Sequence, residues 1–199
     1  MRVTFGFKAH SGWAALVTLG QTNGDPVVVD RQRVDLAGEA WAKQPYHAAE
    51  GLKPAVARDL VKRAIESVHR RAVRELRTAI KRETSRKNEV SGCAVIVGEP
   101  MPDWTVEEIL AVHFRMHKAE GVLFRDALAR AATSCGVTLV QIPEKQLTTH
   151  AEKALKTPAA TLAAKIAMLG KSVGPPWGKD QKEAALAALV ALQGSVRRA

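Results

Sequence analysis

The chain has 199 residues, of which 46% are apolar, and a formal net charge of +10 at pH 7. This length is enough for one domain with a substantial core, and no apolar run reaches the roughly 20 residues that a membrane span needs. The positive charge favours a polyanionic partner, nucleic acid first, although charge alone says nothing about fold.

Targeting signals and cysteine usage point to the cytoplasm. The sequence opens directly on a predicted strand, without a cationic segment followed by a hydrophobic one, so we expect no secretory signal. Cys93 and Cys135 stand apart in apolar surroundings and lack the spacing of a metal site. We therefore expect buried, reduced thiols in a cytoplasmic protein.

The N-terminal part of the chain has the pattern of three strands. Val3, Phe5 and Phe7 alternate on one face, and after a polar break at residues 8–12 the apolar run resumes over residues 13–19. A turn cluster then leads to a third strand over residues 27–36. These strands predict an antiparallel meander that lies at the centre of a sheet.

Residues 38–51 predict a loop of mixed character, and the segment after it predicts one long basic helix. It begins at Pro54, since proline suits the first turn of a helix, and continues to about Lys87 without glycine or another proline. Residues 53–87 contain twelve Lys and Arg against four acidic residues, which is eight of the ten net positive charges. Apolar residues at steps of three and four form one stripe: Val61, Ile65, Val68, Ala72, Leu76 and Ala79. The opposite face is basic: Arg63, Arg70, Arg74, Arg77 and Lys81.

The basic face has two interpretations. Long helices often carry arginine only for solubility and helix propensity, in which case the face is merely solvated. A solubilising face usually mixes both signs of charge, however, whereas twelve cations outnumber four acids in this segment. We therefore expect the face to contact nucleic acid or another polyanion.

The second half of the chain alternates strands and helices. Residues 91–98 are typical of a strand buried on both faces, and residues 137–142 predict a fifth strand. Between them, Thr105 and Glu108 form a capping-box pattern that opens a helix extending to about Cys135. Two more helices are predicted, one from Pro158 to Gly170 and one over residues 182–192.

Several local sequences resemble the Holliday-junction resolvases of the ribonuclease H-like superfamily. Residues 6–8 (Gly-Phe-Lys) and 12–14 (Gly-Trp-Ala) are similar to their first strand and turn, and residues 94–99 to their fourth strand, which ends in a glutamate. Residues 118–122 resemble the following helix, and residues 180–185 the last helix. The resemblance implies a single α/β domain over residues 1–199. It would be a three-layer ribonuclease H-like fold, with a five-stranded mixed sheet flanked by helices.

The resemblance also implies a reaction. These nucleases cut phosphodiesters with two divalent ions, Mg²⁺ or Mn²⁺, which clustered carboxylates hold. By position, Glu99 corresponds to the fourth-strand carboxylate and Glu183 or Asp180 to the acid of the last helix, so Glu99 and Glu183 would bind metal in an active enzyme. The first-strand aspartate corresponds to Lys8, and a cation there would repel metal ions. We therefore expect a nuclease-like scaffold with absent or impaired cleavage.

Each of these residues also has a structural interpretation. Asp180 and Glu183, three residues apart, match the capping pattern of a helix N-terminus, and Glu99 before Pro100 can be an ordinary strand end. Lys8 can reach solvent from its strand end. We hypothesise instead that Lys8 pairs with Glu99 across neighbouring strands, where the metals would have been. If the site is catalytic, His10 is a candidate acid or base.

A second metal-ligand pattern lies on the helix predicted after Thr105. His113 and His117 are four residues apart, a spacing that can place two imidazoles on one metal, and Glu120 lies one turn further. Residue 114 is Phe rather than Glu, which excludes the metalloprotease motif. His113 also shares a predicted face with Ile109 and Met116, which favours a packed, partly buried histidine.

Three functions remain open at this stage. The first is binding of DNA or RNA without cleavage, and the second is a scaffold whose basic helix docks on an acidic protein partner. The third is an active Mg²⁺-dependent endonuclease that uses Glu99, Asp180 and Glu183. A homodimer is compatible with each, and each places the long helix exposed on one face of the sheet.

Overall fold

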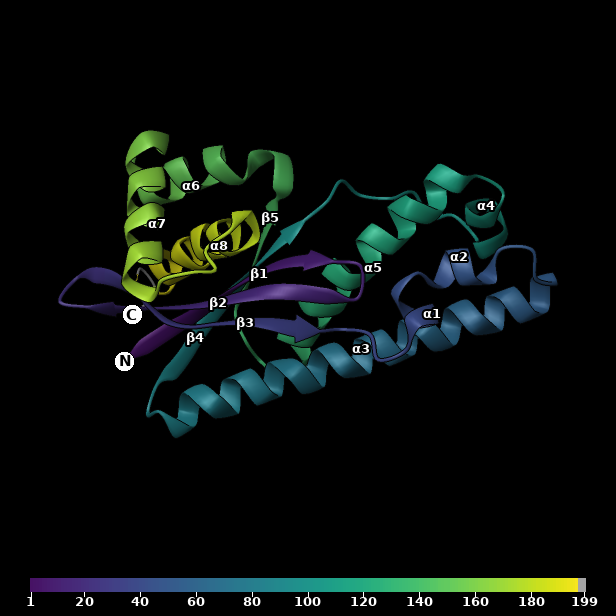
Figure 1. Cartoon of the computed structure of the whole chain (residues 1–199), viewed down its shortest axis with the longest axis horizontal. Coiled ribbons are helices and arrows are strands. Elements are labelled where there is room, and N and C mark those ends of the chain that lie inside the picture. Colours follow the sequence, from purple (N-terminus) through teal and green to yellow (C-terminus); the bar gives the residue numbers. More distant parts are fainter. Residues whose placement is uncertain (197–199) are drawn as a thin grey trace.

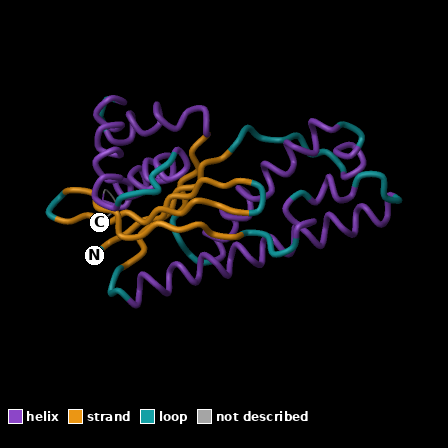
Figure 2. Tube along the Cα trace, in the orientation of Figure 1, coloured by secondary structure: helices purple, strands orange, loops and turns teal. Residues whose placement is uncertain are grey.

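The computed structural model describes residues 1–196, and its centre is a five-stranded mixed sheet with helices on both faces (Figure 1, Figure 2). The order across the sheet is β3-β2-β1-β4-β5. The first three strands form an antiparallel meander, whereas β4 and β5 run parallel to β1. The strands are β1 (Arg2–His10), β2 (Trp13–Thr22), β3 (Asp25–Asp35), β4 (Glu89–Val97) and β5 (Leu139–Pro143). This confirms the predicted fold class.

Two groups of helices cover the sheet (Figure 1). Helices α3 and α5 pack on one face, and α8, supported by α6 and α7, packs on the other. The helices are α1 (Ala40–Lys43), α2 (Pro45–Ala49), α3 (Pro54–Ser85), α4 (Val106–Leu110), α5 (His113–Ser134), α6 (Leu147–Leu155), α7 (Ala159–Val173) and α8 (Lys179–Val196). None of the helices in the described part of the chain has both the length and the apolar character needed to cross a bilayer.

The two faces of β1 meet different helices because side chains alternate along a strand. Phe5 and Phe7 point into the core beneath α3 and α5. On the other face, Thr4 donates a hydrogen bond of 2.8 Å to the carbonyl of Ala188 in α8. A Cβ atom on Gly6 would lie 1.9 Å from the carbonyl oxygen of Ala184. Helix α8 therefore lies directly against β1, and its first turn lies opposite Lys8.

Helix α3 confirms the predicted long helix, from Pro54 to Ser85. Its predicted apolar stripe is buried except for Ile65, which is half-buried. Beyond the end of the sheet, the start of α3 packs with α2, α4 and the start of α5 in a separate apolar cluster that includes Tyr46, Val61 and Met116. This cluster extends the molecule on the side where α2 and α4 lie in Figure 1.

The single helix predicted from Thr105 to Cys135 is wrong in one respect. The capping box forms, because Thr105 accepts from the Glu108 amide at 3.2 Å and the Glu108 carboxylate accepts from the Thr105 amide at 2.8 Å. The helix then ends at Leu110, because Val112 is extended, with φ −140° and ψ 112°. Arg115 donates to the Glu108 carbonyl at 2.9 Å, which satisfies one of the carbonyls that the break leaves free.

Three smaller expectations also need correction. Residues 38–51, predicted as a loop, contain α1 and α2. Helix α7 does not stop at Gly170. The glycine there makes room for the ring of Trp177, which would lie 2.2 Å from a Cβ atom at this position, and so it does not mark the end of the helix. The helix ends instead before Gly174, which has φ 70°. Of the two free cysteines, Cys93 is buried as expected, but Cys135 is only half-buried.

Candidate functional site

Charged side chains gather at the edge where the parallel strands end. Strands β1, β4 and β5 share this edge, and in open α/β sheets ligands bind outside the carboxyl ends of the strands. Lys8 lies two residues before the end of β1, Glu99 two residues after β4, and Glu144 directly after β5. A cavity of ≈ 830 Å³ opens beside the ends of β4 and β5, between them and α5.

Lys8 is the centre of this edge. Its side chain is only 5% exposed, and its ammonium donates a hydrogen bond to Glu144. The same ammonium lies 2.8 Å from Oε2 of Glu183, which comes from the first turns of α8. The close approach of α8 to β1 at Gly6 brings Glu183 within reach. A buried charge is tolerated only when it is paired, and Lys8 has two carboxylate partners.

Further cations surround the two carboxylates. Arg125 on α5 donates to the second oxygen of Glu144 at 2.7 Å, and Lys179 lies 3.7 Å from Glu183. Partial burial raises the pKa of Glu144, but the hydrogen bond from Lys8 and the charges of Lys8, Arg125 and Lys179 outweigh it and hold this pKa below its usual value. Glu144 is therefore ionised at neutral pH, with the cations Lys8 and Arg125 beside it.

The predicted ion pair between Lys8 and Glu99 does not form. Glu99 pairs with Lys145 at 2.6 Å, and its side chain is 65% exposed. The hydrogen bond from Lys145, together with its charge, lowers the pKa of Glu99. The physical reason is that β4 ends at Val97, so that Glu99 lies beyond the sheet, in the connection toward α4.

His10 and Asp180 form a second contact between β1 and α8. Nε2 of His10 lies 3.0 Å from Oδ1 of Asp180, without the alignment of a hydrogen bond, and the imidazole stacks on Trp13 at 4.5 Å between ring centroids. The acids of α8 therefore face the end of β1 rather than cap their own helix. It is Gln181 that accepts the amide of Gly178, at 3.0 Å, at the helix N-terminus.

The sequence interpretation missed Glu144, although a signal was present. The fifth strand was expected to end at Ile142, and Glu144 lies two residues further, directly after Pro143. An acid directly after the carboxyl end of a parallel strand is a candidate site residue for the same topological reason as Glu99.

These residues do not fit the two-metal centre that the resemblance implies. Such a centre needs clustered oxygen ligands whose negative charge is free to bind the ions. Here a buried ammonium lies between Glu144 and Glu183, and the guanidinium of Arg125 occupies the remaining oxygen of Glu144. An incoming divalent ion would have to displace Lys8 and would meet its positive charge.

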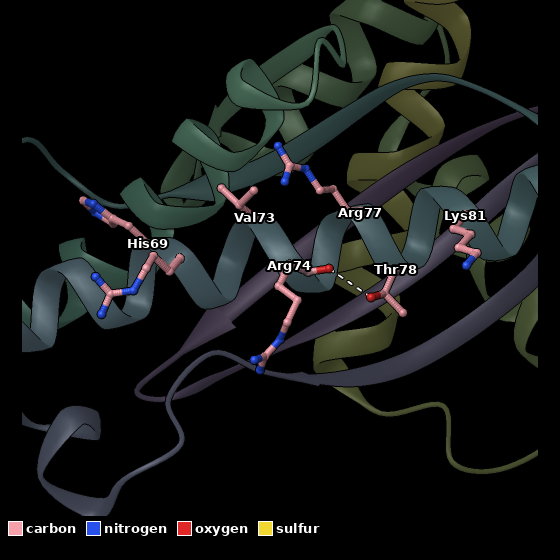
Figure 3. A pocket seen from close by; sticks show the side chains of 7 residues that line it. His69, Val73, Arg74, Arg77, Thr78 and Lys81 are labelled. Atoms are coloured by element: carbon pink, nitrogen blue, oxygen red, sulfur yellow. Dashed lines mark hydrogen bonds between the residues drawn. The ribbon is translucent and has the colours of Figure 1, made fainter.

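The basic face of α3 is a second candidate surface. All five residues predicted for it are exposed. A shallow hollow of ≈ 500 Å³ lies along it, and Figure 3 shows its side chains along one stretch of the helix. Arg63, Arg70 and Arg74 each pair with an acid of α3, at 2.9, 3.8 and 3.2 Å. Arg77 and Lys81 make no ion pair with any residue in the described range 1–196.

His113 lies outside both surfaces, whereas His117 lines the cavity beside the ends of β4 and β5. The expectation that His113 is packed is wrong. Both side chains are exposed. Helix α5 begins at His113 after the break at Val112, so His113 no longer shares a continuous helical face with Ile109.

Comparison with known proteins identifies the architecture. No protein-family model and no curated protein matches the sequence. Among solved structures, the chain is similar to Thermus thermophilus RuvC, at 13% sequence identity over 98% of this chain and 96% of that chain, with a TM-score of 0.51. It is also similar to T. thermophilus RuvC in complex with Holliday junction substrate, at 13% identity over 100% and 96% of the two chains, with a TM-score of 0.50. The chain therefore has a ribonuclease H-like fold of the kind found in the Holliday-junction resolvase RuvC, as the resemblance in its sequence predicted.

Proposed function

We propose that this protein binds nucleic acid on the basic face of α3 and does not cleave it by two-metal chemistry. The observation that carries the proposal is the row of five exposed cations on a ribonuclease H-like scaffold. The similar RuvC structure with a Holliday junction substrate supports the choice of nucleic acid over other polyanions. A buried Lys8 between two carboxylates supports the absence of cleavage.

The dimensions of the basic face suit a phosphate backbone. From Arg63 to Lys81 the helix rises about 27 Å, at roughly 1.5 Å per residue. A row of this length can contact several successive phosphates, each of which releases counterions on binding. The ion pairs that hold three of the arginines are on the surface and contribute little, so they exchange readily for phosphate contacts. Contacts of this kind position a duplex without reading its sequence.

The absence of cleavage follows from charge. Two-metal hydrolysis requires ions that activate water and stabilise the leaving oxygen, and those ions require free carboxylates. Glu144 and Glu183 are instead neutralised within the protein by Lys8, with Arg125 and Lys179 beside them.

Fluorescence anisotropy with a four-way DNA junction, a DNA duplex and a structured RNA tests the proposal, with parallel cleavage lanes containing Mg²⁺ or Mn²⁺. We expect affinity that falls with salt at a slope of about −0.9 per phosphate contact, and no cleavage product. The triple variant Arg70→Glu, Arg74→Glu, Arg77→Glu should weaken binding to all three probes and reduce the slope by roughly 3.

A matched control carries the same change of charge elsewhere. Lys153, Lys165 and Lys171 are exposed on α6 and α7, and their reversal to Glu should leave binding close to that of the wild type. Equal losses in both triple variants would contradict the assignment to α3. If the wild type bound none of the three probes at about 0.15 M salt, the acidic protein partner would replace nucleic acid. Cleavage that disappears in Glu183→Gln would refute the absence of catalysis.

A further inference from the structure

Three histidines converge where α2 meets the start of α5. His47 comes from α2, and His113 and His117 come from the first two turns of α5. One ring nitrogen from each lies within 4.8 Å of the other two. The centroids of the three rings are 4.6, 4.6 and 5.1 Å apart. His47 is half-buried and the other two are exposed, so the cluster is open to solvent.

This arrangement is close to that of imidazoles on a single metal ion. The Nε2 atoms of His113 and His117 lie 3.0 Å apart, on successive turns of one helix. Zinc binds imidazole nitrogen at about 2.0–2.1 Å, so two such ligands of a tetrahedral ion are about 3.3 Å apart. Small adjustments of the side chains would bring the third nitrogen to the same distance.

A buried carboxylate fixes the orientation of His47. Glu120 is only 2% exposed, and both of its oxygens lie 2.9 Å from Nδ1 of His47. The backbone amides of Tyr46 and His47 also donate to Glu120, at 3.2 Å each. With Nδ1 donating to the carboxylate, Nε2 is the nitrogen left to bind an ion. A carboxylate behind a histidine is the usual outer partner of a metal ligand, because it sets the tautomer and raises the basicity of the ring.

The charge of Glu120 is an independent indication. Among residues 1–196, its only ion-pair partner is His47, which carries a charge only when it is protonated. A buried carboxylate needs a nearby positive charge, and a divalent ion bound to His47 would supply it. No lysine or arginine in the described chain provides that charge directly.

We propose that His47, His113 and His117 bind one divalent transition-metal ion of the class that prefers imidazole, such as Zn²⁺, with Glu120 as the residue that positions His47. Three protein ligands leave a fourth tetrahedral position for water or another ligand. The ion would link α2 to α5, two elements that lie 66 residues apart at His47 and His113. His117 also lines the cavity beside the ends of β4 and β5, together with Arg125 and Glu144, but the proposed metal site does not depend on the function proposed above.

Zinc binding by the full, untagged chain tests this proposal. Protein that has been stripped with a chelator is titrated with Zn²⁺ in competition with a chromophoric chelator, and its thermal unfolding is followed with and without Zn²⁺. We expect one Zn²⁺ per chain and a higher melting temperature when Zn²⁺ is present. His113→Ala and His117→Ala, which alter exposed residues, should each lower the affinity at least about 100-fold and abolish the thermal shift.

Two further variants make the result specific. Glu120→Gln should lower the affinity for Zn²⁺ about 10- to 100-fold, because the outer partner of His47 loses its charge. His150→Ala, on α6 and outside the cluster, should bind Zn²⁺ like the wild type. Failure of the untagged wild type to bind stoichiometric Zn²⁺ would overturn the proposal. Unchanged affinity in the double variant His113→Ala, His117→Ala would also overturn it, since the ion would then lie elsewhere.

Discussion

Replacing Lys8 with methionine removes the charge of its side chain while keeping a similar length and apolar character. Glu144 and Glu183 would then face each other's negative charge without the ammonium between them. Removing one partner of a buried ion pair costs about 3–5 kcal/mol. Here the cost is smaller, because the two carboxylates are 38% and 21% exposed and Arg125 and Lys179 remain beside them. We expect a loss of about 2 kcal/mol at pH 7, or a melting temperature lower by about 4–8 °C for a domain of this size.

The loss should depend on pH in a defined direction. Burial alone would raise the pKa of Glu144, but Lys8 and the neighbouring cations lower it in the folded protein. The stabilisation from this ion pair is therefore complete above the unfolded pKa, about 4.3, and disappears as the pH falls through the lower folded value. The difference between wild type and Lys8→Met should be largest at neutral pH and should shrink below about pH 4.

Urea unfolding followed by circular dichroism at pH 7 and at acidic pH measures both effects. Lys145→Met is the matched control, because it breaks the exposed ion pair with Glu99 and should unfold close to the wild-type midpoint. Equal midpoints for Lys8→Met and Lys145→Met at pH 7 would refute the idea that Lys8 neutralises a buried cluster. A difference at pH 7 that persists unchanged in acid would show that lost packing, rather than lost charge, destabilises the variant.

Two other substitutions test neighbouring parts of the site. Lys8→Asp should create a cluster of free carboxylates with Glu144 and Glu183 and so raise the affinity for Mn²⁺, measured by calorimetry, above that of the wild type and of Lys8→Asn. Unchanged Mn²⁺ affinity would contradict the positional match between Lys8 and a metal-binding carboxylate. Gly6→Ala should lower the free energy of unfolding by about 3 kcal/mol, because its Cβ atom would lie 1.9 Å from the Ala184 carbonyl oxygen. Gly121→Ala is the control, because a Cβ atom at this position in α5 meets nothing within 4 Å, and its free energy of unfolding should equal that of the wild type or exceed it by up to about 1 kcal/mol. Similar losses of stability in Gly6→Ala and Gly121→Ala would contradict the close contact of α8 with β1.

Local patterns were sufficient to predict most of the fold. Alternation in the first three strands, the long periodic stripe of α3 and the apolar run of β4 each depend on residues close in sequence. The break between α4 and α5 could not be predicted in this way. It depends on the extended conformation of Val112 and on a hydrogen bond from Arg115 to a carbonyl seven residues earlier.

The site was harder to predict because its pairings depend on one or two residues at strand ends. The sequence grouped Lys8 and Glu183 in one candidate site, and the structure brings them within 2.8 Å of each other. That Lys8 takes the position of a metal-binding carboxylate stays a prediction. The sequence also suggested Glu99 as the partner of Lys8, and that was wrong, because Glu99 lies past the end of β4 while Glu144 follows β5 directly. The sequence indicated two members of the three-histidine cluster, His113 and His117, as a pair four residues apart. The third ligand, His47, comes from a segment predicted to be an irregular loop.

The surroundings of Lys8 result from the packing of α8 against β1 rather than from the needs of a catalysed reaction. Thr4, Gly6 and Lys8 lie on the same face of β1, and each meets α8, at Ala188, Ala184 and Glu183 respectively. Carboxylates brought to this edge from β5 and α8 repel each other and must be neutralised wherever water is limited. Metal ions can supply that charge from solution, but a lysine on β1 supplies it permanently and at a fixed position. The residue that prevents metal binding in our proposal, Lys8, is thus the same one that makes the edge of the sheet stable without an ion.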